Sequence, residues 1–396
     1  LPGSIMDGKS WTVIGDGSSV KLEVQADGTA FNLSALSFTD WSSSDDIIIN
    51  GTTGSDTMTG TTNEDRLEGL AGNDVLNGSS GIDTIFGQDG DDTISGDAGN
   101  DIIWGGPGAD NLMGGTGNDT FRFNAGAGEV AAGEQINGGA DTDTLYIHDP
   151  NITTDFTNIA SITNTEVLDL YGYKATARFA GSLINAKTWE VTGNGGDVNL
   201  EVQADGSAFD LSGLTFSNWT NTSDEIFVLG TSGNDTMTGS IEKDKIEGFA
   251  GNDVLNGSSG IDTIFGQDGD DTISGDAGND IIWGGPGADN LMGGTGNDTF
   301  RFNAGAGEVA AGEQIDGGTD TDTLYIPDSN IITDFTAAAS INNVEILDLY
   351  GYKTTARFAG SLMDAKSWSV TGNGSAVNLE VQADGSAFDL SGLTFS

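Results

Sequence analysis

The sequence is poor in the residues that most often cross-link or constrain a fold or carry out catalysis. It contains no cysteine, one histidine and five prolines among 396 residues. Without cysteine there can be neither a disulfide nor a thiolate metal site. A single histidine also excludes an H-E-x-x-H zinc site. The stability of the fold must therefore come from other sources.

Positive charge and long apolar runs are scarce as well. Lys and Arg total 13 against 61 Asp and Glu, which gives a formal net charge of -48. Nucleic acids and anionic membranes are polyanions, so we expect neither as a partner, and cations become the natural ones. The stretch "IIIN" at 47–50 is typical of the longest apolar runs. A membrane span needs about 18 apolar residues, so we expect none.

What the sequence does contain is glycine and a long internal repeat. Glycine occurs 62 times, about twice the usual ~7%. The stretch "LEVQADGTAFNLSALSF" at 22–38 returns, slightly changed, at 200–216 and 379–395. The last two copies lie 179 residues apart, which indicates tandem 179-residue repeats with a truncated third copy. Because the chain opens "LPGSIMDGKS", we interpret it as a processed product or part of something longer.

A second, nine-residue period lies inside the long one. From Gly51 to Arg122 the chain divides into eight nonamers, including GSSGIDTIF, GQDGDDTIS and GDAGNDIIW, and a second block runs from Gly230 to Arg301. All sixteen nonamers have Gly first, Asp sixth and an apolar residue eighth. A degenerate ninth copy follows each block at 138–146 and 317–325, with Asp in place of the fourth-position Gly.

This spacing has a direct structural meaning. Six residues rich in Gly, Asp and Asn form a turn, and the remaining three form a short strand. Two nonamers would make one coil of 18 residues, and coils would stack about 4.8 Å apart into parallel sheets. We expect the eighth residue of each nonamer to point inward, which places these side chains in the core: Met58, Leu67, Leu76, Ile85, Ile94, Ile103, Leu112, Phe121, Met237, Leu255 and Ile264.

One apolar side chain per nine residues gives a thin core. At about 2 kcal/mol each, these side chains do not offset about 1 to 2 kcal/mol of backbone entropy per residue, so we expect bound metal to supply the difference. Carboxylate and carbonyl oxygens suit Ca²⁺, whereas Mg²⁺ requires tighter geometry and transition metals favour His or Cys. Aspartates two nonamers apart, such as Asp74 and Asp92, would lie above one another.

The nonamers resemble the RTX repeat, G-G-x-G-x-D-x-U-x, whose family forms calcium-binding parallel β-rolls. The resemblance implies an all-β fold with right-handed parallel β-rolls, and Ca²⁺ ions shared between loops such as those of Asp83 and Asp101. The metal ligands that it implies are Asp56, Asp74, Asp83, Asp92, Asp101, Asp110, Asp119, Asp235, Asp253, Asp262, Asp271, Asp280, Asp289 and Asp298.

Four further aspartates are expected to bind calcium more weakly: Asp65, Asp244, Asp143 and Asp322. The nonamers of Asp65 and Asp244 replace the fourth-position Gly with Asn63 and Glu242. The second of these nonamers also brings Lys243 and Lys245 beside Asp244, so a cationic side chain could stand in for the metal there.

The segments between the blocks lose the nine-residue period but keep short β-type runs, among them "TLYI" at 144, "EVLDL" at 166 and "IFVL" at 226. Two interpretations remain open: an irregular β-solenoid that continues the roll, which we favour, or a small separate β-sandwich. Helix is expected to be limited to one or two turns, such as "AGSLINAK" at 180–187. The predicted division of the chain is a β segment at 1–50, rolls at 51–146 and 230–325, and inter-roll β segments at 147–229 and 326–396.

Nothing in the sequence indicates catalysis. His148 is replaced by Pro327 one long repeat later, so we predict a surface residue rather than part of a Ser-His-Asp site, and we predict that the chain is not an enzyme. Trp104 and Phe86 could line a glycan-binding stripe, although packing against a neighbouring strand is the more usual role. "GTGND" at 115–119 has the letters of an ice-binding array but occurs once per block.

These observations favour a structural function. We expect an extracellular rod, filament or surface layer that self-associates and folds on Ca²⁺ binding after export, which for the RTX family is typically by type I secretion. One alternative is the calcium-folding secretion region of a larger RTX toxin, protease or lipase. A second alternative is a glycan- or ice-binding adhesin module.

Overall fold

The computed structural model describes residues 1–15, 19–28, 30–42, 45–124, 128–148, 150–193, 196–220, 222–303, 308–327, 330, 332–372 and 376–396. They form two compact units: the first contains Leu1–Phe179, Thr188–Asn199 and Thr215–Asp224, and the second Ala180–Lys187, Leu200–Leu214 and Glu225–Ser396. Each unit contains one block of nonamers. In the part of the chain that is described, no helix is long and apolar enough to span a membrane.

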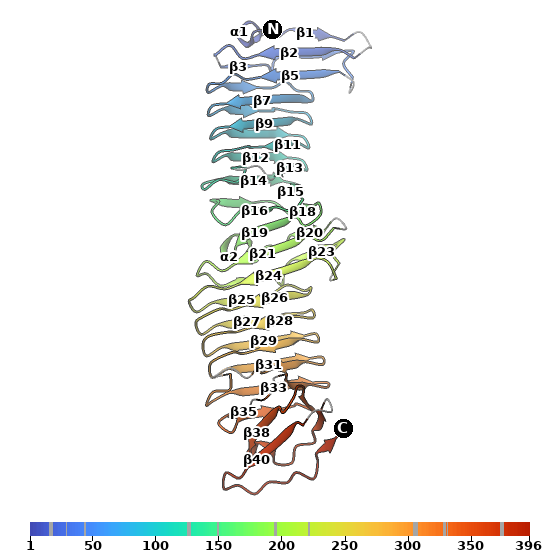
Figure 1. Cartoon of the computed structure of the whole chain (residues 1–396). Helices are drawn as coiled ribbons and strands as arrows, with labels where there is room; N and C mark the ends of the chain where they lie inside the picture. The colour runs from blue at the N-terminus through green and yellow to red at the C-terminus, as the bar shows by residue number, and fades with distance from the viewer. Residues whose placement is uncertain are drawn as a thin grey trace. The chain divides into compact units, whose positions relative to one another are not determined.

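The first unit is almost entirely β-structure with one short helix (Figure 1). Its elements are α1 (Gly3–Met6), β1 (Thr12–Ile14), β2 (Lys21–Gln25), β3 (Phe31–Asn32), β4 (Ser37–Thr39), β5 (Asp46–Asn50), β6 (Thr57–Thr59), β7 (Asp65–Ala71), β8 (Val75–Asn77), β9 (Thr84–Asp89), β10 (Thr93–Ala98), β11 (Ile102–Trp104), β12 (Asn111–Thr116), β13 (Thr120–Phe123), β14 (Gln135–Ala140), β15 (Thr144–His148), β16 (Thr153–Asp155), β17 (Ser161–Thr163), β18 (Val167–Tyr171), β19 (Thr176–Ala180), β20 (Glu190–Gly193) and β23 (Thr215–Ser217).

The second unit repeats this arrangement. Its elements are α2 (Gly181–Ile184), β21 (Asn199–Gln203), β22 (Phe209–Asp210), β24 (Glu225–Leu229), β25 (Thr236–Thr238), β26 (Asp244–Glu247), β27 (Val254–Asn256), β28 (Thr263–Phe265), β29 (Thr272–Ala277), β30 (Ile281–Trp283), β31 (Asn290–Thr295), β32 (Thr299–Arg301), β33 (Gln314–Thr319), β34 (Thr323–Ile326), β35 (Ile332–Phe335), β36 (Ser340–Asn342), β37 (Ile346–Leu349), β38 (Thr355–Ala359), α3 (Gly360–Met363), β39 (Ser369–Gly372), β40 (Asn378–Gln382) and β41 (Thr394–Phe395). The single helical turn predicted near 180–187 is α2.

The nonamers form the predicted 18-residue coils. Consecutive nonamers alternate between two sheets, so β10 pairs in parallel with β8 and β12, and β11 pairs with β9 and β13. Ile103 lies opposite Ile85, 18 residues earlier. In the first unit one sheet has the strand order β3-β6-β8-β10-β12-β14-β17. The other runs β2-β5-β7-β9-β11-β13-β15-β18-β20-β23, which places successive coils one above another.

The eighth residue of every nonamer points into the coil, as predicted. These side chains range from Met58, which is 1% exposed, to Ile85 and Phe121, which have no exposed surface. The seventh and ninth residues lie on the outer faces, where some, such as Thr84 and Phe86, are half-buried and others, such as Val75, are exposed. The roll therefore has a core one side chain wide.

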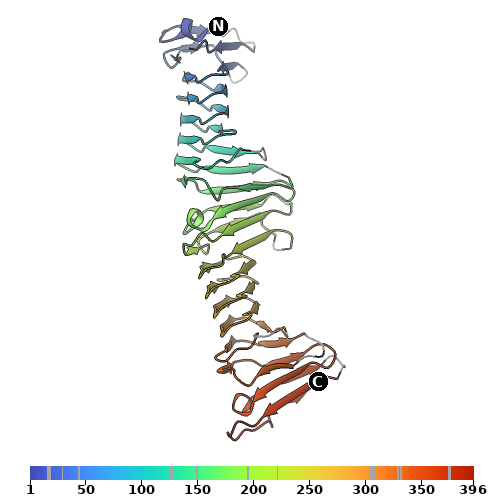
Figure 2. The same ribbon diagram turned by 60° about the vertical axis from the view of Figure 1, so that its left-hand side comes forward.

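The coils widen after each block (Figure 2). A six-residue insertion places Thr144 opposite Thr120, and further on a third strand joins each coil, seen where β16 pairs with β19. The wider coils enclose aromatic rings: the Phe156 ring meets Phe123 edge to face at 5.2 Å and stacks on Phe179 at 5.0 Å. Because β15, β18, β20 and β23 extend the same sheet in parallel, the segment after the roll is a continuing β-solenoid and not a separate sandwich.

Candidate metal centre

The sixth-position aspartates form two columns along each roll. Each aspartate lies immediately before its strand or, like Asp65 and Asp244, is the first residue of the strand. Except in the last aspartate of each column, its backbone N–H donates to Oδ1 of the aspartate one coil further on. Asp74 donates to Asp92 over 2.8 Å, and Asp83 donates to Asp101 over 2.8 Å. This confirms the predicted stacking of these pairs. The columns of the first roll are Asp56-Asp74-Asp92-Asp110 and Asp65-Asp83-Asp101-Asp119-Asp143, and those of the second are Asp235-Asp253-Asp271-Asp289 and Asp244-Asp262-Asp280-Asp298-Asp322.

The second carboxylate oxygen, Oδ2, is buried and has no hydrogen-bond partner in most of these residues. We call the turns that end at them open turns. Their aspartates are Asp74, Asp83, Asp92, Asp101, Asp110, Asp119, Asp143, Asp253, Asp262, Asp271, Asp280, Asp289, Asp298 and Asp322. A buried carboxylate oxygen without a partner is costly, so each open turn requires either a proton or a cation.

The first Gly of each nonamer makes room for this oxygen. A Cβ atom at Gly87 would collide with Oδ2 of Asp92 and lie 2.6 Å from the carbonyl oxygen of Gly105. The second and fourth positions of an open turn also have positive φ, for example Gln88 at 72° and Gly90 at 140°. Even the Asp that replaces the fourth Gly in the ninth copy, Asp141, has a φ of 83°. The turn therefore depends on backbone conformations that Gly adopts most easily.

Four aspartates differ because the backbone N–H of a Thr or Ser donates to their Oδ2, and the hydroxyl of the same residue donates to the same carboxylate. We call these turns, which begin at Gly51, Gly60, Gly230 and Gly239, capped turns. The backbone N–H of Thr52 donates to Asp56 Oδ2 over 2.6 Å, and its hydroxyl donates over 2.9 Å. The other caps are Thr61 on Asp65, Thr231 on Asp235 and Ser240 on Asp244.

The expected cationic stand-in at Asp244 is not what the structure shows. Lys245 forms an ion pair with Glu247 on the outer face, and Ser240 supplies the partners of Asp244. The capped turns also include those of Asp56 and Asp235, which the sequence pattern did not separate from the other ligands. The difference arises at the second residue of the nonamer, which the consensus leaves variable.

Burial dominates the electrostatics of the columns. It raises the pKa of Asp83 to about 8 and that of Asp262 to about 9, with the neighbouring Asp65 and Asp244 charges adding to the effect. Burial also raises the pKa of the capped Asp65 to about 7, because it outweighs the hydrogen bonds from Thr61. At neutral pH these carboxyl groups favour the protonated form unless a cation compensates the charge.

The donor set fits calcium. Among the described residues, no group of three or more His, Cys, Asp or Glu side chains is placed to hold a metal ion. An ion in an open turn would therefore be held by Asp oxygens together with backbone carbonyls. Hard oxygen donors without nitrogen or sulfur are the chemistry that Ca²⁺ prefers.

Two buried glutamates, which the nine-residue period does not identify, extend one column of each roll. Asp110 donates its N–H to Glu134 Oε2 over 3.1 Å, and Asp289 donates to Glu313 Oε2 over 3.2 Å. Burial raises the pKa of both glutamates to about 9. A sequence signal was present, because "EQINGG" at 134–139 aligns with "DNLMGG" at 110–115 once the six-residue insertion is allowed for.

Aromatic side chains form a row on the outer face of the first roll. Phe86 and Trp104 stack with centroids 4.5 Å apart, and the Arg122 guanidinium lies 5.1 Å from the Trp104 ring centroid. The rings thus present their faces to each other and to arginine. This is the packing role considered for Trp104. His148 stacks on Tyr171 at 5.1 Å.

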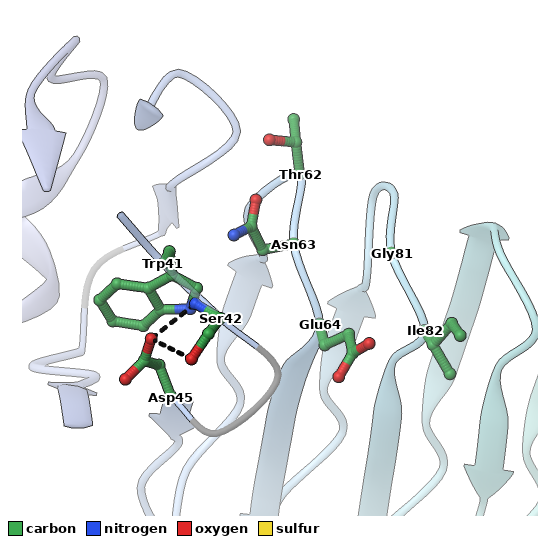
Figure 3. Close-up of a pocket in the computed structure, with 8 residues that line it drawn as sticks. All are labelled: Trp41, Ser42, Asp45, Thr62, Asn63, Glu64, Gly81 and Ile82. Atoms are coloured by element: carbon green, nitrogen blue, oxygen red, sulfur yellow. Dashed lines mark hydrogen bonds between the residues drawn. The ribbon is translucent and has the colours of Figure 1, made fainter. Parts of the chain in front are cut away.

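A pocket of about 350 Å³ lies at the start of the first roll (Figure 3). Its lining includes Trp41, Asn63, Glu64 and Ile82. A second acidic residue of the lining, Asp45, accepts hydrogen bonds from the N–H and hydroxyl of Ser42. The backbone N–H groups of Ser42 and Val20 lower the pKa of Asp45, so it remains an ionised acceptor rather than a proton donor at neutral pH.

Comparison with known families agrees with this geometry. A family model described as the RTX calcium-binding nonapeptide repeat matches the chain in four copies, at residues 50–85, 86–121, 229–264 and 265–300. A search of curated proteins gave no match. The four matched segments cover the two blocks of nonamers and leave the inter-roll segments unmatched. The two blocks of nonamers therefore match the RTX calcium-binding nonapeptide repeat, and this match is consistent with an RTX repeat protein.

Proposed function

We propose that the chain is a structural repeat module whose rolls fold when Ca²⁺ binds at the open turns. The observation that carries the proposal is the set of buried Oδ2 atoms without hydrogen-bond partners, which recurs along both columns of both rolls. Bound Ca²⁺ supplies the positive charge that these oxygens lack. Its binding free energy then becomes folding free energy, since the turns do not exist in the unfolded chain.

The open turns are the proposed sites, and the capped turns are proposed to be free of metal. In an open turn the aspartate side chain and the backbone carbonyls of the glycine-rich loop would hold the ion. In a capped turn the backbone N–H of the Thr or Ser already donates to Oδ2, and its hydroxyl donates to the same carboxylate. Asp56 and Asp235 were expected among the firm ligands, and under this proposal they join Asp65 and Asp244 as metal-independent residues.

Far-UV circular dichroism in EGTA and in millimolar Ca²⁺ tests the proposal. We expect β-structure to be strongly reduced at pH 8 in EGTA and restored by Ca²⁺ but not by equal Mg²⁺. The same β content in both buffers would refute calcium-dependent folding.

We further propose that the protein acts outside the cell, after export by type I secretion, as part of a rod, filament or surface layer. Type I export suits a chain that stays unfolded at low Ca²⁺ and folds in millimolar Ca²⁺. Near-identical tandem units lengthen a structure, whereas catalysis gains nothing from a second calcium module, so we do not propose an enzyme.

Electron microscopy of the native protein in Ca²⁺ addresses the assembly. Filaments or sheets support the structural role. Isolated particles at all concentrations would instead favour the calcium-folding region of a larger secreted effector.

A further inference from the structure

Glu134 occupies an aspartate position in a turn outside the matched repeats. The turn is six residues longer than a repeat turn, yet Gln135 lies opposite Asn111 in the sheet, so Glu134 lies opposite Asp110. Glutamate is one methylene longer than aspartate, and its Oε2 still accepts the Asp110 N–H. Glu134 thus continues the column that runs through Asp74, Asp92 and Asp110.

The other oxygen of Glu134 is in the same state as the Oδ2 atoms of the open turns. Glu134 has no exposed surface, and its Oε1 has no hydrogen-bond partner. The neighbouring Asp110 Oδ2 is partnerless as well. Beyond Glu134 the column ends, because Ala160 is the next residue in line and donates only to the Glu134 carbonyl oxygen.

The second unit repeats each of these features. Glu313 has no exposed surface, its Oε1 has no partner, and its Oε2 accepts the Asp289 N–H. Ala339 ends this column in the same way.

We propose that Glu134 and Glu313 are ligands of one additional Ca²⁺ ion per unit, at the end of the first aspartate column and outside the repeats. The ion would be shared with Asp110 or Asp289, whose free oxygens lie in the same column. This inference rests on the proposed function, because it assumes that Ca²⁺ satisfies the partnerless oxygens. It extends the metal-binding part of each roll by one turn.

The next coil supplies a matched control. Glu166 Oε2 accepts the Asp143 N–H over 2.9 Å, and Glu345 accepts that of Asp322 over 2.9 Å. Glu166 is exposed and Glu345 is half-buried, and neither carries a buried oxygen without a partner. Glu166 and Glu345 therefore continue a hydrogen-bonded column without a buried, partnerless oxygen, and each unit contains one of them for comparison.

The experiment compares bound Ca²⁺ per folded chain in wild type, in Glu134→Gln with Glu313→Gln, and in Glu166→Gln with Glu345→Gln. Equilibrium dialysis with elemental analysis gives the count, and circular dichroism in Ca²⁺ confirms folding. We expect the first variant to lose two ions per chain and the control to lose none. An unchanged count in the first variant would overturn the inference, whereas a wild-type protein that binds no Ca²⁺ would refute the proposed function instead.

Anomalous diffraction from wild-type crystals grown with Tb³⁺ or Ca²⁺ locates the ions even if the variant fails to fold. We expect a peak beside Glu134 Oε1 and another beside Glu313 Oε1. Peaks along the aspartate columns with none at the two glutamates would contradict the additional site while leaving the proposed function intact.

Discussion

Capped and open turns of one roll each lead into a short strand and each hold a buried aspartate at the sixth position of the nonamer. They close in different ways. In a capped turn the Thr52 hydroxyl accepts the Gly54 N–H and donates to Asp56, so the loop is closed by its own residues. In an open turn the Gly90 N–H donates to the Pro107 carbonyl oxygen of the next coil, and Asp92 Oδ2 is left without a partner.

The second residue of the nonamer accounts for most of this difference. Open turns place it at positive φ, as at Leu70 and Gln88, which the β-branched Thr52 and Thr61 strongly disfavour. The capped turn also leaves the fourth position unconstrained, which explains why Asn63 and Glu242 replace Gly there. The first coil of each roll is thus closed by its own Thr or Ser residues, whereas under the proposed function the coils that follow depend on a cation.

The largest expected effect is that of pH on the calcium-free protein, and it acts on the buried carboxyl groups of open turns and of capped turns such as that of Asp65. Burial raises the pKa of Asp83 to about 8 and of Asp110 to about 7. The folded roll therefore binds protons that the unfolded chain releases above about pH 4, and its stability falls as pH rises from about 4 to about 8.

Thermal melts in EGTA at pH 5 and pH 8 measure this dependence. We expect a Tm lower by at least about 15 °C at pH 8, since several buried carboxyl groups contribute and about 1 kcal/mol corresponds to 2–4 °C in a unit of this size. In saturating Ca²⁺ the trend should reverse, because protons compete with the metal. Stability in EGTA that rises with pH would contradict the role of the buried carboxyl groups.

The next largest effect is expected from a methyl group added at the fourth position of the nonamer, which should destabilise an open turn much more than a capped turn. A Cβ atom at Gly90 would collide with the carbonyl oxygen of Gly72 at a φ of 140°, whereas at Gly54 the nearest atom is 3.9 Å away. We expect Gly90→Ala to destabilise the first unit by about 3 kcal/mol or more and Gly54→Ala by less than about 0.5 kcal/mol. Urea unfolding in Ca²⁺ provides the comparison, and similar losses in both variants would show that the turns do not differ.

Neutralising one aspartate in each kind of turn separates metal binding from hydrogen bonding. We expect Asp92→Asn to raise the Ca²⁺ concentration at the folding midpoint at least about tenfold, equivalent to about 1.4 kcal/mol. Asp56→Asn should lose about 1 kcal/mol of stability through its Thr52 bonds, with no loss of bound Ca²⁺. Calcium titrations followed by circular dichroism distinguish the two. A lost ion in Asp56→Asn would assign metal to the capped turn.

The smallest effect concerns the hydroxyl itself. Thr61→Val keeps the branched side chain and the N–H but removes the hydroxyl bond to Asp65. We expect a loss of about 1 kcal/mol in EGTA and in Ca²⁺ alike. The matched change Ser79→Ala, in an open turn, should have almost no effect on unfolding. A larger loss at Ser79 would reverse the assignment.

Much of this architecture could be predicted from the nine-residue period alone. Asp at every ninth position and an apolar residue two places later predicted the 18-residue coil, the inward side chains from Met58 to Phe121 and the stacked pairs Asp74–Asp92 and Asp83–Asp101. These features follow from local chain geometry, so a repeating pattern is sufficient to reveal them.

The remaining features depend on contacts that a consensus does not encode. Whether a turn is capped depends on the backbone of its second residue, which has positive φ at Leu70 but not at Thr52. The consensus leaves this second position variable, so it does not reveal the difference. The nine-residue period does not identify Glu134, because the six-residue insertion places Glu134 outside that register. The aromatic core around Phe156 and Phe179 forms only after a third strand widens the coil.

Hydrogen exchange of the folded protein in Ca²⁺, followed by transfer to EGTA at pH 8, tests the central claim most directly. The two kinds of turn predict different results for the backbone amides of the aspartate columns. The amides of Asp74, Asp83, Asp92 and Asp101 should lose protection on Ca²⁺ removal, whereas those in the first coil, at residues 51–64, should lose much less. Equal protection of both groups in EGTA, or equal loss from both, would contradict the account.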